Sequence, residues 1–265
     1  MDLAKIYLEE DLFPKDITSW IERPYGFLFY NDENKESYDS NHALVFRNRV
    51  TELDQVLEDI VQFYSEKGIR PSIYQSIADD GYFEHISDEL TRHGFSFWTE
   101  PQSYMVLLGE NKIQPNPNIT VQKVTRWDDA FATHIFEAAG EPWEIDVAKK
   151  ALDKANTLFF VAYDNSVPVG MTHCHVADGV CRVDYLLVAT NCRNKGVGRA
   201  LIHYFVEYCV QNHIENCYLW PDGETAANIY QEAGFRTVAV KQAGRAVARK
   251  EEIDELLMLR IQSAK

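Results

Sequence analysis

The sequence predicts two related α/β domains, because the same order of elements occurs in each half of the 265 residues. A helix, a strand, a helix that ends in Gly-Phe and a second strand follow one another twice, which is typical of an internal repeat. Between the halves, residues 109–120 are polar, contain two prolines and have no hydrophobic period, which favours a linker. We therefore expect a first domain over residues 1–110, a linker over 111–118 and a second domain over 119–265.

The first half contains one predicted copy of this order. Its first helix has apolar residues at helical spacing, with Thr51 as the predicted N-cap and Asp54 at the N3 position. Its second helix is followed by Gly94, which is typical of a helix C-terminus. The predicted elements are a helix over 51–69, a strand over 70–77, a helix over 81–93 and a strand over 95–98.

The second half contains the other copy, preceded by further elements. Residues 164–166, Asp-Asn-Ser, separate two apolar runs and predict a hairpin turn. The last stretch, 248–262, fits a helix, although a closing strand over 256–261 would also fit. The copy itself comprises a helix over 198–213, a strand over 217–220, a helix over 224–233 ended by Gly234 and a strand over 235–240. The preceding elements are strands over 119–124, 157–163, 167–177 and 180–189, and helices over 128–140 and 144–155.

The formal net charge of -15 is unevenly distributed between the halves. Residues 1–118 hold 22 acidic and 10 basic residues, a net of -12, whereas residues 119–265 hold 19 and 16, a net of -3. Nucleic-acid binding requires a continuous basic surface, so the composition argues against it. The acidic first half favours attraction of a cationic substrate, although an acid excess also serves solubility alone.

The sequence also argues against a membrane protein, a secreted protein and a metal site. No apolar run reaches the roughly 20 residues needed to span a bilayer, and the first residues carry acids where a signal peptide carries bases. The five cysteines are odd in number and no two are spaced as CxxC, so we expect reduced thiols in a cytoplasmic protein and no metal. His173 and His175 share one face of a predicted strand, but the sequence offers no third ligand beside them.

One basic, glycine-containing stretch interrupts this acidic chain: CRNKGVGRAL, residues 192–201. It lacks the spacing of a Walker A loop and the third small residue of a dinucleotide fingerprint, although Asp222 after the next strand keeps the latter open. It matches R/Q-x-x-G-x-G/A at every fixed position, and the alternative is a plain strand-to-helix turn with solvated cations. Glycines let backbone N–H groups surround a pyrophosphate, and the N-terminus of the following helix adds positive potential. The candidate anion-binding residues are Arg193, Asn194, Lys195, Gly196, Val197, Gly198, Arg199 and Ala200.

Residues 119–261 resemble the GNAT superfamily of acyl-CoA-dependent N-acyltransferases. The resemblance rests on LLVATNCRNKGVGRALI, residues 186–202, followed after one strand and a turn by AANIYQEAGF, residues 226–235. It implies domains that each have a central mixed, mostly antiparallel sheet flanked by helices, with acetyl-CoA as the co-substrate bound at the basic loop. Two positions depart from the pattern: Thr190 stands where many members have Pro, and Gly223 where many have an Asn that helps to hold the coenzyme.

The first half resembles the superfamily only in its helix-strand-helix-strand tail. Its stretch HALVFRNRVTEL, which precedes the first helix, contains no glycine, so the coenzyme loop is missing there. The resemblance therefore implies a tandem arrangement, in which residues 1–110 form a degenerate GNAT-like domain and residues 119–265 form the catalytic one.

The resemblance also implies roles for two backbone positions and one tyrosine. A backbone N–H near Leu187 or Val188, exposed where the next strand splays away, would stabilise the tetrahedral oxyanion. Tyr230, on the second helix, would lie near the thioester sulfur and protonate the leaving thiolate. The alternative for Tyr230 is a tyrosine packed on the core from an amphipathic helix.

A base is expected as well, because an alkylamine with a pKa of about 10.4 is almost fully protonated near pH 7. Asp184, on the third predicted strand, is one candidate and would act through water, although a polar residue at a strand start explains it equally well. Glu141 is the other candidate, with Glu144 as its alternative on a segment that often shapes the acceptor site in this superfamily.

The sequence thus predicts an N-acetyltransferase that moves an acetyl group from acetyl-CoA to a primary amine by direct attack in a ternary complex. A small-molecule acceptor is expected, and the acidic first half favours a cationic one. A non-catalytic coenzyme A-binding or scaffold module is the alternative, and a nicotinamide-dependent enzyme is a further one.

Overall fold

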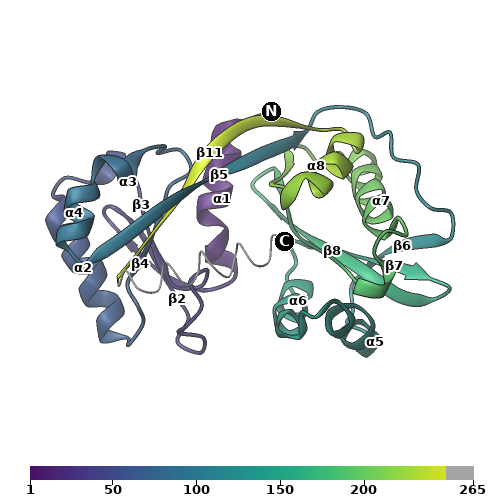
Figure 1. Cartoon of the computed structure of the whole chain (residues 1–265), viewed down its shortest axis with the longest axis horizontal. Coiled ribbons are helices and arrows are strands. Elements are labelled where there is room, and N and C mark those ends of the chain that lie inside the picture. Colours follow the sequence, from purple (N-terminus) through teal and green to yellow (C-terminus); the bar gives the residue numbers. More distant parts are fainter. Residues whose placement is uncertain (249–265) are drawn as a thin grey trace. The chain divides into compact units, whose positions relative to one another are not determined.

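The computed structural model describes residues 1–248, so the alternative strand over 256–261 lies outside the described residues. The described chain divides into two compact units (Figure 1). Unit 1 consists of Met1–Ile6 and Ser103–Val240, and unit 2 consists of Tyr7–Gln102 and residues 241–248. The predicted fold class is confirmed, since each unit combines helices with mixed, mostly antiparallel strand pairing.

Unit 1 is built on a mixed sheet. Its strands are β5 (Phe95–Leu107), β6 (Ile119–Val124), β7 (Thr157–Asp164), β8 (Val167–Ala177), β9 (Val180–Val188), β10 (Cys217–Leu219) and β11 (Phe235–Ala248), of which β5 and β11 continue into unit 2. The order across the sheet is β11-β5-β10-β9-β8-β7-β6, and β9 pairs with β10 in parallel, whereas β8 pairs with both β7 and β9 in the antiparallel sense. Asn165 and Ser166 adopt positive φ angles of 48° and 68° in the predicted turn between β7 and β8, as a two-residue hairpin turn requires.

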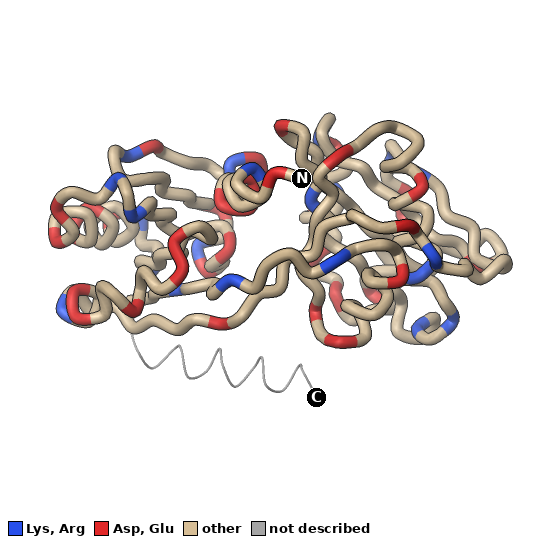
Figure 2. The backbone as a smooth tube through the Cα atoms, turned by 90° about the horizontal axis from the view of Figure 1, so that it is seen from above, with Lys and Arg blue, Asp and Glu red and all other residues tan. Residues whose placement is uncertain are grey.

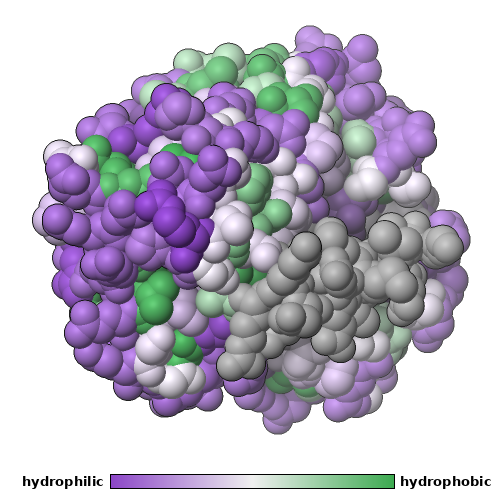
Figure 3. Space-filling view, turned by 60° about the vertical axis from the view of Figure 1, so that its left-hand side comes forward, coloured by the Kyte–Doolittle hydropathy of each residue, from purple (hydrophilic) through white to green (hydrophobic). Residues whose placement is uncertain are grey.

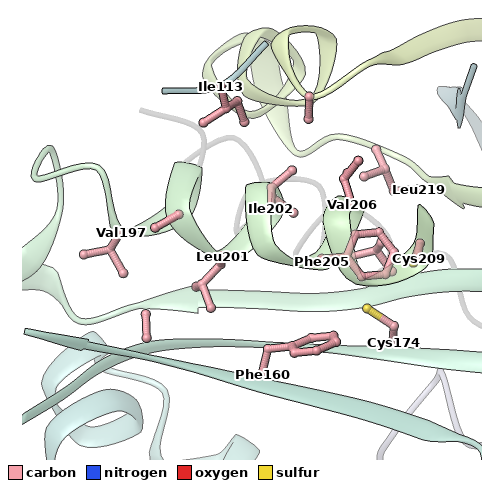
Figure 4. Packing of buried hydrophobic residues seen from close by; sticks show 14 of the residues in the cluster. Ile113, Phe160, Cys174, Val197, Leu201, Ile202, Phe205, Val206, Cys209 and Leu219 are labelled. Atoms are coloured by element: carbon pink, nitrogen blue, oxygen red, sulfur yellow. The ribbon is translucent and has the colours of Figure 1, made fainter. Parts of the chain in front are cut away.

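Helices cover both faces of this sheet (Figure 1). They are α5 (Asp129–Phe131), which continues as the π-helical η3 (Ala132–Glu137), then η4 (Pro142–Glu144), α6 (Ile145–Leu152), η5 (Thr190–Cys192), α7 (Val197–Gln211) and α8 (Gly223–Glu232). Phe160 packs under α7 with Leu201 and Phe205 (Figure 4), whereas its neighbour Phe159 packs with η3 and α6 on the other face. Successive residues of a strand face opposite sides of the sheet, so β7 contributes side chains to the cores on both faces.

Unit 2 has its own hydrophobic core and contains the other end of the 11-stranded order. Its strands are β1 (Ser19–Arg23), β2 (Gly26–Tyr30), β3 (His42–Val45) and β4 (Ser72–Gln75), followed across the sheet by the end of β11. The helices of the first half are α1 (Leu3–Leu12), η1 (Phe13–Asp16), η2 (Arg47–Arg49), α2 (Leu53–Glu66), α3 (Tyr82–His85) and α4 (Ser87–Arg92). Tyr64 of α2 is fully buried and donates its hydroxyl hydrogen to the carbonyl oxygen of Phe29 at 2.8 Å, which ties the helix to the sheet.

Two details of the first half differ from the sequence prediction. The first helix begins at Leu53 with Glu52 as its N-cap and no side-chain capping bond, so Thr51 is not the cap. A 3₁₀ turn closed by the Val50 N–H and the Arg47 carbonyl ends just before it, which leaves Thr51 outside the helix. The predicted helix over 81–93 is divided at Ile86, whose φ of -108° and ψ of 23° are not helical.

The compact units do not follow the predicted ranges. Residues 241–248 belong to unit 2 because β11 continues past the predicted strand end and pairs there with β4, for example Arg245 with Tyr74. The segment expected as a linker, 111–118, lies within unit 1. Ile113 is only 3% exposed and packs in the α7 core, and the Asn111 amide donates to Glu207 of α7 at 3.0 Å. Polarity alone therefore did not distinguish a packed connection from a free linker.

The surface agrees with the composition. Acidic positions are scattered through both units with basic positions interspersed (Figure 2), and the face seen in Figure 3 is mainly hydrophilic with small apolar patches. Within residues 1–248, no helix is both long enough and apolar enough to cross a membrane.

Candidate functional site

The stretch Arg193–Gly198 comprises the end of the loop that follows β9, up to Gly196, and the first two residues of α7. Gly196 is the N-cap residue of α7 with a φ of 82°, and Asn194 has a φ of 62°. Both lie in the left-handed region that glycine and asparagine adopt most readily. The first N–H groups of a helix have no intrahelical acceptor, and they point at the loop where the helix dipole is positive. This backbone geometry can hold an anion.

Two residues that the sequence analysis did not select position this loop. Asn116 donates its side-chain amide hydrogen to the carbonyl oxygen of Lys195 at 2.9 Å, so the polar connection before β6 supports the loop. Gly170 of β8 lets α7 approach the sheet, because a Cβ atom there would lie 2.8 Å from Cγ1 of Val197 and 2.9 Å from the carbonyl oxygen of Leu187. An interior glycine in a predicted strand is a signal of such close approach and could have identified Gly170.

The basic side chains of this stretch differ in whether they pair with an acidic residue. Arg193 and Lys195 are exposed, and Nε of Arg193 lies 3.5 Å from the carbonyl oxygen of Val188. Arg199 instead forms a two-pronged ion pair with Glu232 of α8, with one Nη2–Oε1 distance of 2.9 Å, and this pairing raises the pKa of Arg199. Arg199 thus connects α7 to α8.

The remaining candidates, Val197, Gly198 and Ala200, lie in the first turn of α7. The side chains of Val197 and Ala200 are buried in the α7 core. The Ala200 N–H donates to the carbonyl oxygen of Gly196 at 3.0 Å, so of these two residues only Val197 offers an N–H that can face a ligand. A Cβ atom at Gly198 would have only Leu186 as a neighbour, at 3.9 Å, so this position has room for a small side chain, as the motif G/A allows.

The sheet opens beside this loop. β9 and β10 pair through Cys181 and Arg182, near the start of β9, whereas residues 183–188 have no β10 partner in the part of the chain that the structure describes. Parallel strands that pair at one end and separate at the other leave a wedge whose backbone groups are not used by the sheet. The β9–β10 ladder thus ends before the part of β9 at which the splay is predicted, and we refer to the region between 183–188 and β10 as the wedge.

Strand alternation decides which N–H groups face the wedge. The N–H of Ala189 donates to the carbonyl oxygen of Val169 at 3.0 Å, toward β8. Because backbone direction alternates along an antiparallel ladder, Leu187 also faces β8, where it pairs with Met171, whereas Val188 faces the wedge. Of the two predicted positions, the structure directs the N–H of Val188, not that of Leu187, into the opening.

Tyr230 lies on α8 and packs against the α7 core, with its ring 6.1 Å from that of Phe235 in an edge-to-face arrangement. Burial, with smaller contributions from the Cys174 thiol and the Asp222 carboxylate, raises the pKa of Tyr230 to about 12. The phenol therefore stays protonated and can donate a hydrogen bond throughout the physiological range.

Asp184 stands at an irregularity of β9. The register passes from His173–Tyr185 to Cys174–Val183, so Asp184 is the extra residue of a β-bulge. One of its carboxylate oxygens forms an ion pair with Arg182, and the other lies 3.5 Å from Nδ1 of His173. Burial lowers the pKa of His173 to about 3, so this imidazole is neutral. The Asp184 side chain is 23% exposed, which leaves it accessible to water.

Glu141 is the N-cap residue of the short helix η4, and Glu144 is its last residue. Glu144 is buried, and Glu141 accepts a hydrogen bond of 2.7 Å from the indole N–H of the exposed Trp143. Burial, followed by the two carboxylates Glu144 and Glu141, raises the pKa of Tyr185 above its ordinary value, which places both acids close to that phenol. Tyr185 follows the bulge and precedes the wedge-facing Val188 by three residues, so the two acids interact with a residue of the strand that borders the wedge.

Comparison with known proteins identifies the segment that carries this site. Residues 122–235 match the family model described as the acetyltransferase (GNAT) family. This segment is a GNAT domain. A search of curated proteins gives no match to the chain.

Solved structures extend the likeness beyond that segment. A GCN5-related N-acetyltransferase from Kribbella flavida matches with a TM-score of 0.71 and 16% identity, over 95% of this chain and 97% of its own. A functionally unknown conserved protein from Staphylococcus epidermidis matches with a TM-score of 0.61 and 18% identity, over 89% and 97%. A tandem GNAT protein from the clavulanic acid biosynthesis pathway matches with a TM-score of 0.53 and 11% identity, over 78% and 74%. At these identities the likeness establishes the fold.

Proposed function

We propose that the GNAT domain transfers an acetyl group from acetyl-CoA to the primary amine of a small cationic molecule, by direct attack in a ternary complex. The observation that carries this proposal is the position of the loop 193–198 at the positive end of α7, at the end of the strand that borders the wedge. The pyrophosphate would bind the loop, and the pantetheine arm would enter the wedge. Unit 2, which lacks such a loop, is proposed as a degenerate GNAT-like companion.

The wedge would also supply the donor for the reacting carbonyl. An extended pantetheine arm can pair with unused backbone groups of a strand as a further strand would. The Val188 N–H would then stabilise the negative charge that develops on the thioester oxygen as the amine attacks. Asp184 would receive the proton of the attacking ammonium through water, since its carboxylate is accessible to solvent.

Tyr230 would assist the departure of the thiolate by donating a hydrogen bond. Its pKa of about 12 lies above the roughly 8.5 of a thiol, so full transfer of its proton is unfavourable, whereas a hydrogen bond to the charged sulfur is favourable. We expect Tyr230→Phe to lower kcat by about tenfold to a hundredfold, the value of one hydrogen bond to a charged group. Steady-state kinetics with saturating acetyl-CoA measures this change.

Two readouts separate this role from packing. Tyr204→Phe removes the hydroxyl of a part-buried α7 tyrosine in the same core, and it should leave kcat within about twofold. Because Tyr230 stays protonated, its ionisation should produce no loss of kcat between pH 8 and about pH 10.5. An unchanged kcat in Tyr230→Phe would show that the tyrosine only packs.

Where the acceptor is a diamine, Glu141 and Glu144 would bind the ammonium group that is not acetylated. We expect Glu141→Gln to raise KM for a diamine by about fivefold, the value of one partly exposed ion pair, and to leave KM for a monoamine of similar length unchanged. Glu137→Gln is the matched control, because it removes the same charge from an exposed position on the preceding helix. Equal effects of Glu141→Gln on both amines would exclude Glu141 from acceptor recognition.

A further inference from the structure

Three cysteines far apart in the sequence meet in the core of unit 1. Cys181 of β9, Cys209 of α7 and Cys217 of β10 are buried, and their sulfur atoms all lie within 4.8 Å of one another. Cys174 of β8 is also fully buried in this core, and its sulfur points toward α7 (Figure 4). We refer to these four residues as the cysteine cluster.

The strand register explains why the four side chains converge. Cys181 and Cys217 are direct neighbours across the parallel β9–β10 pair, so their side chains lie on one face of the sheet. Cys174 pairs with Val183, two residues beyond Cys181, and therefore lies diagonally from Cys181 on that same face. α7 packs on this face and completes the cluster with Cys209. The spacing in sequence, which contains no CxxC, gave no sign of this arrangement.

We propose that the cysteine cluster is a structural zinc site. Thiolates are the ligands preferred by thiophilic ions such as zinc, and tetrahedral zinc with Zn–S bonds of about 2.3 Å sets its sulfurs about 3.8 Å apart. The sulfurs of Cys181, Cys209 and Cys217 lie at most 4.8 Å apart, so approach by about 1 Å, within reach of χ1 rotations, would bring these three into a coordination shell that Cys174 completes. A divalent ion is favoured over a monovalent one because it leaves less net negative charge in an apolar core.

Binding must displace protons, because buried thiols are neutral without a metal. All four cysteines are buried, and burial disfavours the charged thiolate; the Cys217 thiol donates toward the carbonyl oxygen of Ile214 over 3.6 Å. Zinc would replace these protons, so its affinity should increase with pH. The consequence for the fold is local: Cys181 and Cys217 occupy the pair at which β9 and β10 are still joined, so the ion would fix the closed end of the wedge.

The test uses the full-length chain, produced and purified under reducing conditions. Zinc content is measured by elemental analysis, before and after unfolding with a chelator and refolding with Zn²⁺. We expect about one zinc ion per chain in the wild type, and less than about a tenth of that in the Cys209→Ser/Cys217→Ser double variant. Cys192→Ser is the matched control, because Cys192 is the fifth buried cysteine, lies before the coenzyme loop and should be dispensable for zinc.

A second measurement keeps the test decisive if the double variant does not fold. Wild-type protein refolded with Co²⁺ should show thiolate-to-cobalt charge-transfer absorption, with intensity that saturates at about one equivalent. The proposal is overturned if the folded wild type contains no zinc and gives no such absorption. It is equally overturned if mass spectrometry finds a disulfide within the cluster, or if Cys192→Ser loses zinc to the same extent as the double variant.

Discussion

Gly196→Glu is expected to abolish the binding of acetyl-CoA. The residue has a φ of 82°, and a Cβ atom there would lie 3.3 Å from Cβ of Asn116, which supports the loop. The substitution adds a side chain to the centre of the proposed anion site and adds negative charge where the pyrophosphate would bind. In the wild type, acetyl-CoA at one hundred times its Kd should stabilise the fold by about 2.7 kcal/mol. In the variant this stabilisation should disappear, as measured by thermal unfolding with and without coenzyme.

Gly179→Glu is the matched control for this prediction. Gly179 has a nearly equal φ of 78° and lies at the opposite end of β9, and a Cβ atom there would meet nothing within 4 Å. Both variants pay a similar cost of about 1 kcal/mol for a side chain in the left-handed region, so their stability without ligand should be similar. If acetyl-CoA still stabilised the Gly196→Glu variant, the loop would not be part of the coenzyme site.

Val188→Pro is expected to lower kcat by about a hundredfold to a thousandfold, the effect of removing one oxyanion donor. Proline lacks the N–H, and at this position the N–H faces the wedge, so the β8–β9 ladder does not lose a hydrogen bond. Binding of acetyl-CoA should be weakened much less than catalysis, because the loop that would hold the pyrophosphate is untouched. Steady-state kinetics and thermal shift on the same preparation separate the two effects.

Two comparisons show whether the backbone donor causes this loss. Val188→Ala changes the side chain and keeps the N–H, so its kcat should stay within about threefold of the wild type. Leu187→Pro removes an N–H that faces β8, so it should lower thermal stability in addition to activity. A Val188→Pro enzyme with normal kcat would show that the oxyanion is stabilised elsewhere.

The sequence predicted the helices and strands of the GNAT domain well because their signals are local. The hairpin turn at Asn165, the C-terminal glycine Gly234 and the loop before α7 each require particular residue types, and the structure has all three features at the predicted places. The lengths of β5 and β11 were less predictable. The residues that follow the predicted strand ends, 99–103 in β5 and 241–245 in β11, are mainly polar, and the strands continue because they pair with neighbours far away in the sequence.

Only those parts of the site whose chemistry depends on a single continuous segment could be predicted from the sequence. The basic loop could be read from its spacing, whereas the choice of Val188 over Leu187 depends on the direction of the β8 pairing. The pairing of Arg199 with Glu232 and the cysteine cluster depend on tertiary contacts, which no spacing rule contains. Asp222, which kept a dinucleotide site open at the sequence level, is the N-cap residue of α8 and forms no side-chain capping bond there.

The central claim is that the GNAT domain catalyses acetyl transfer from acetyl-CoA, and release of free thiol from acetyl-CoA in the presence of a panel of amines tests it most directly. We predict thiol release that requires both amine and enzyme, saturates with acetyl-CoA, is strongest with cationic amines and is absent in Gly196→Glu. The opposite result is stabilisation of the wild type by acetyl-CoA without thiol release above background for any amine. That outcome would contradict catalysis and identify a coenzyme-binding module instead.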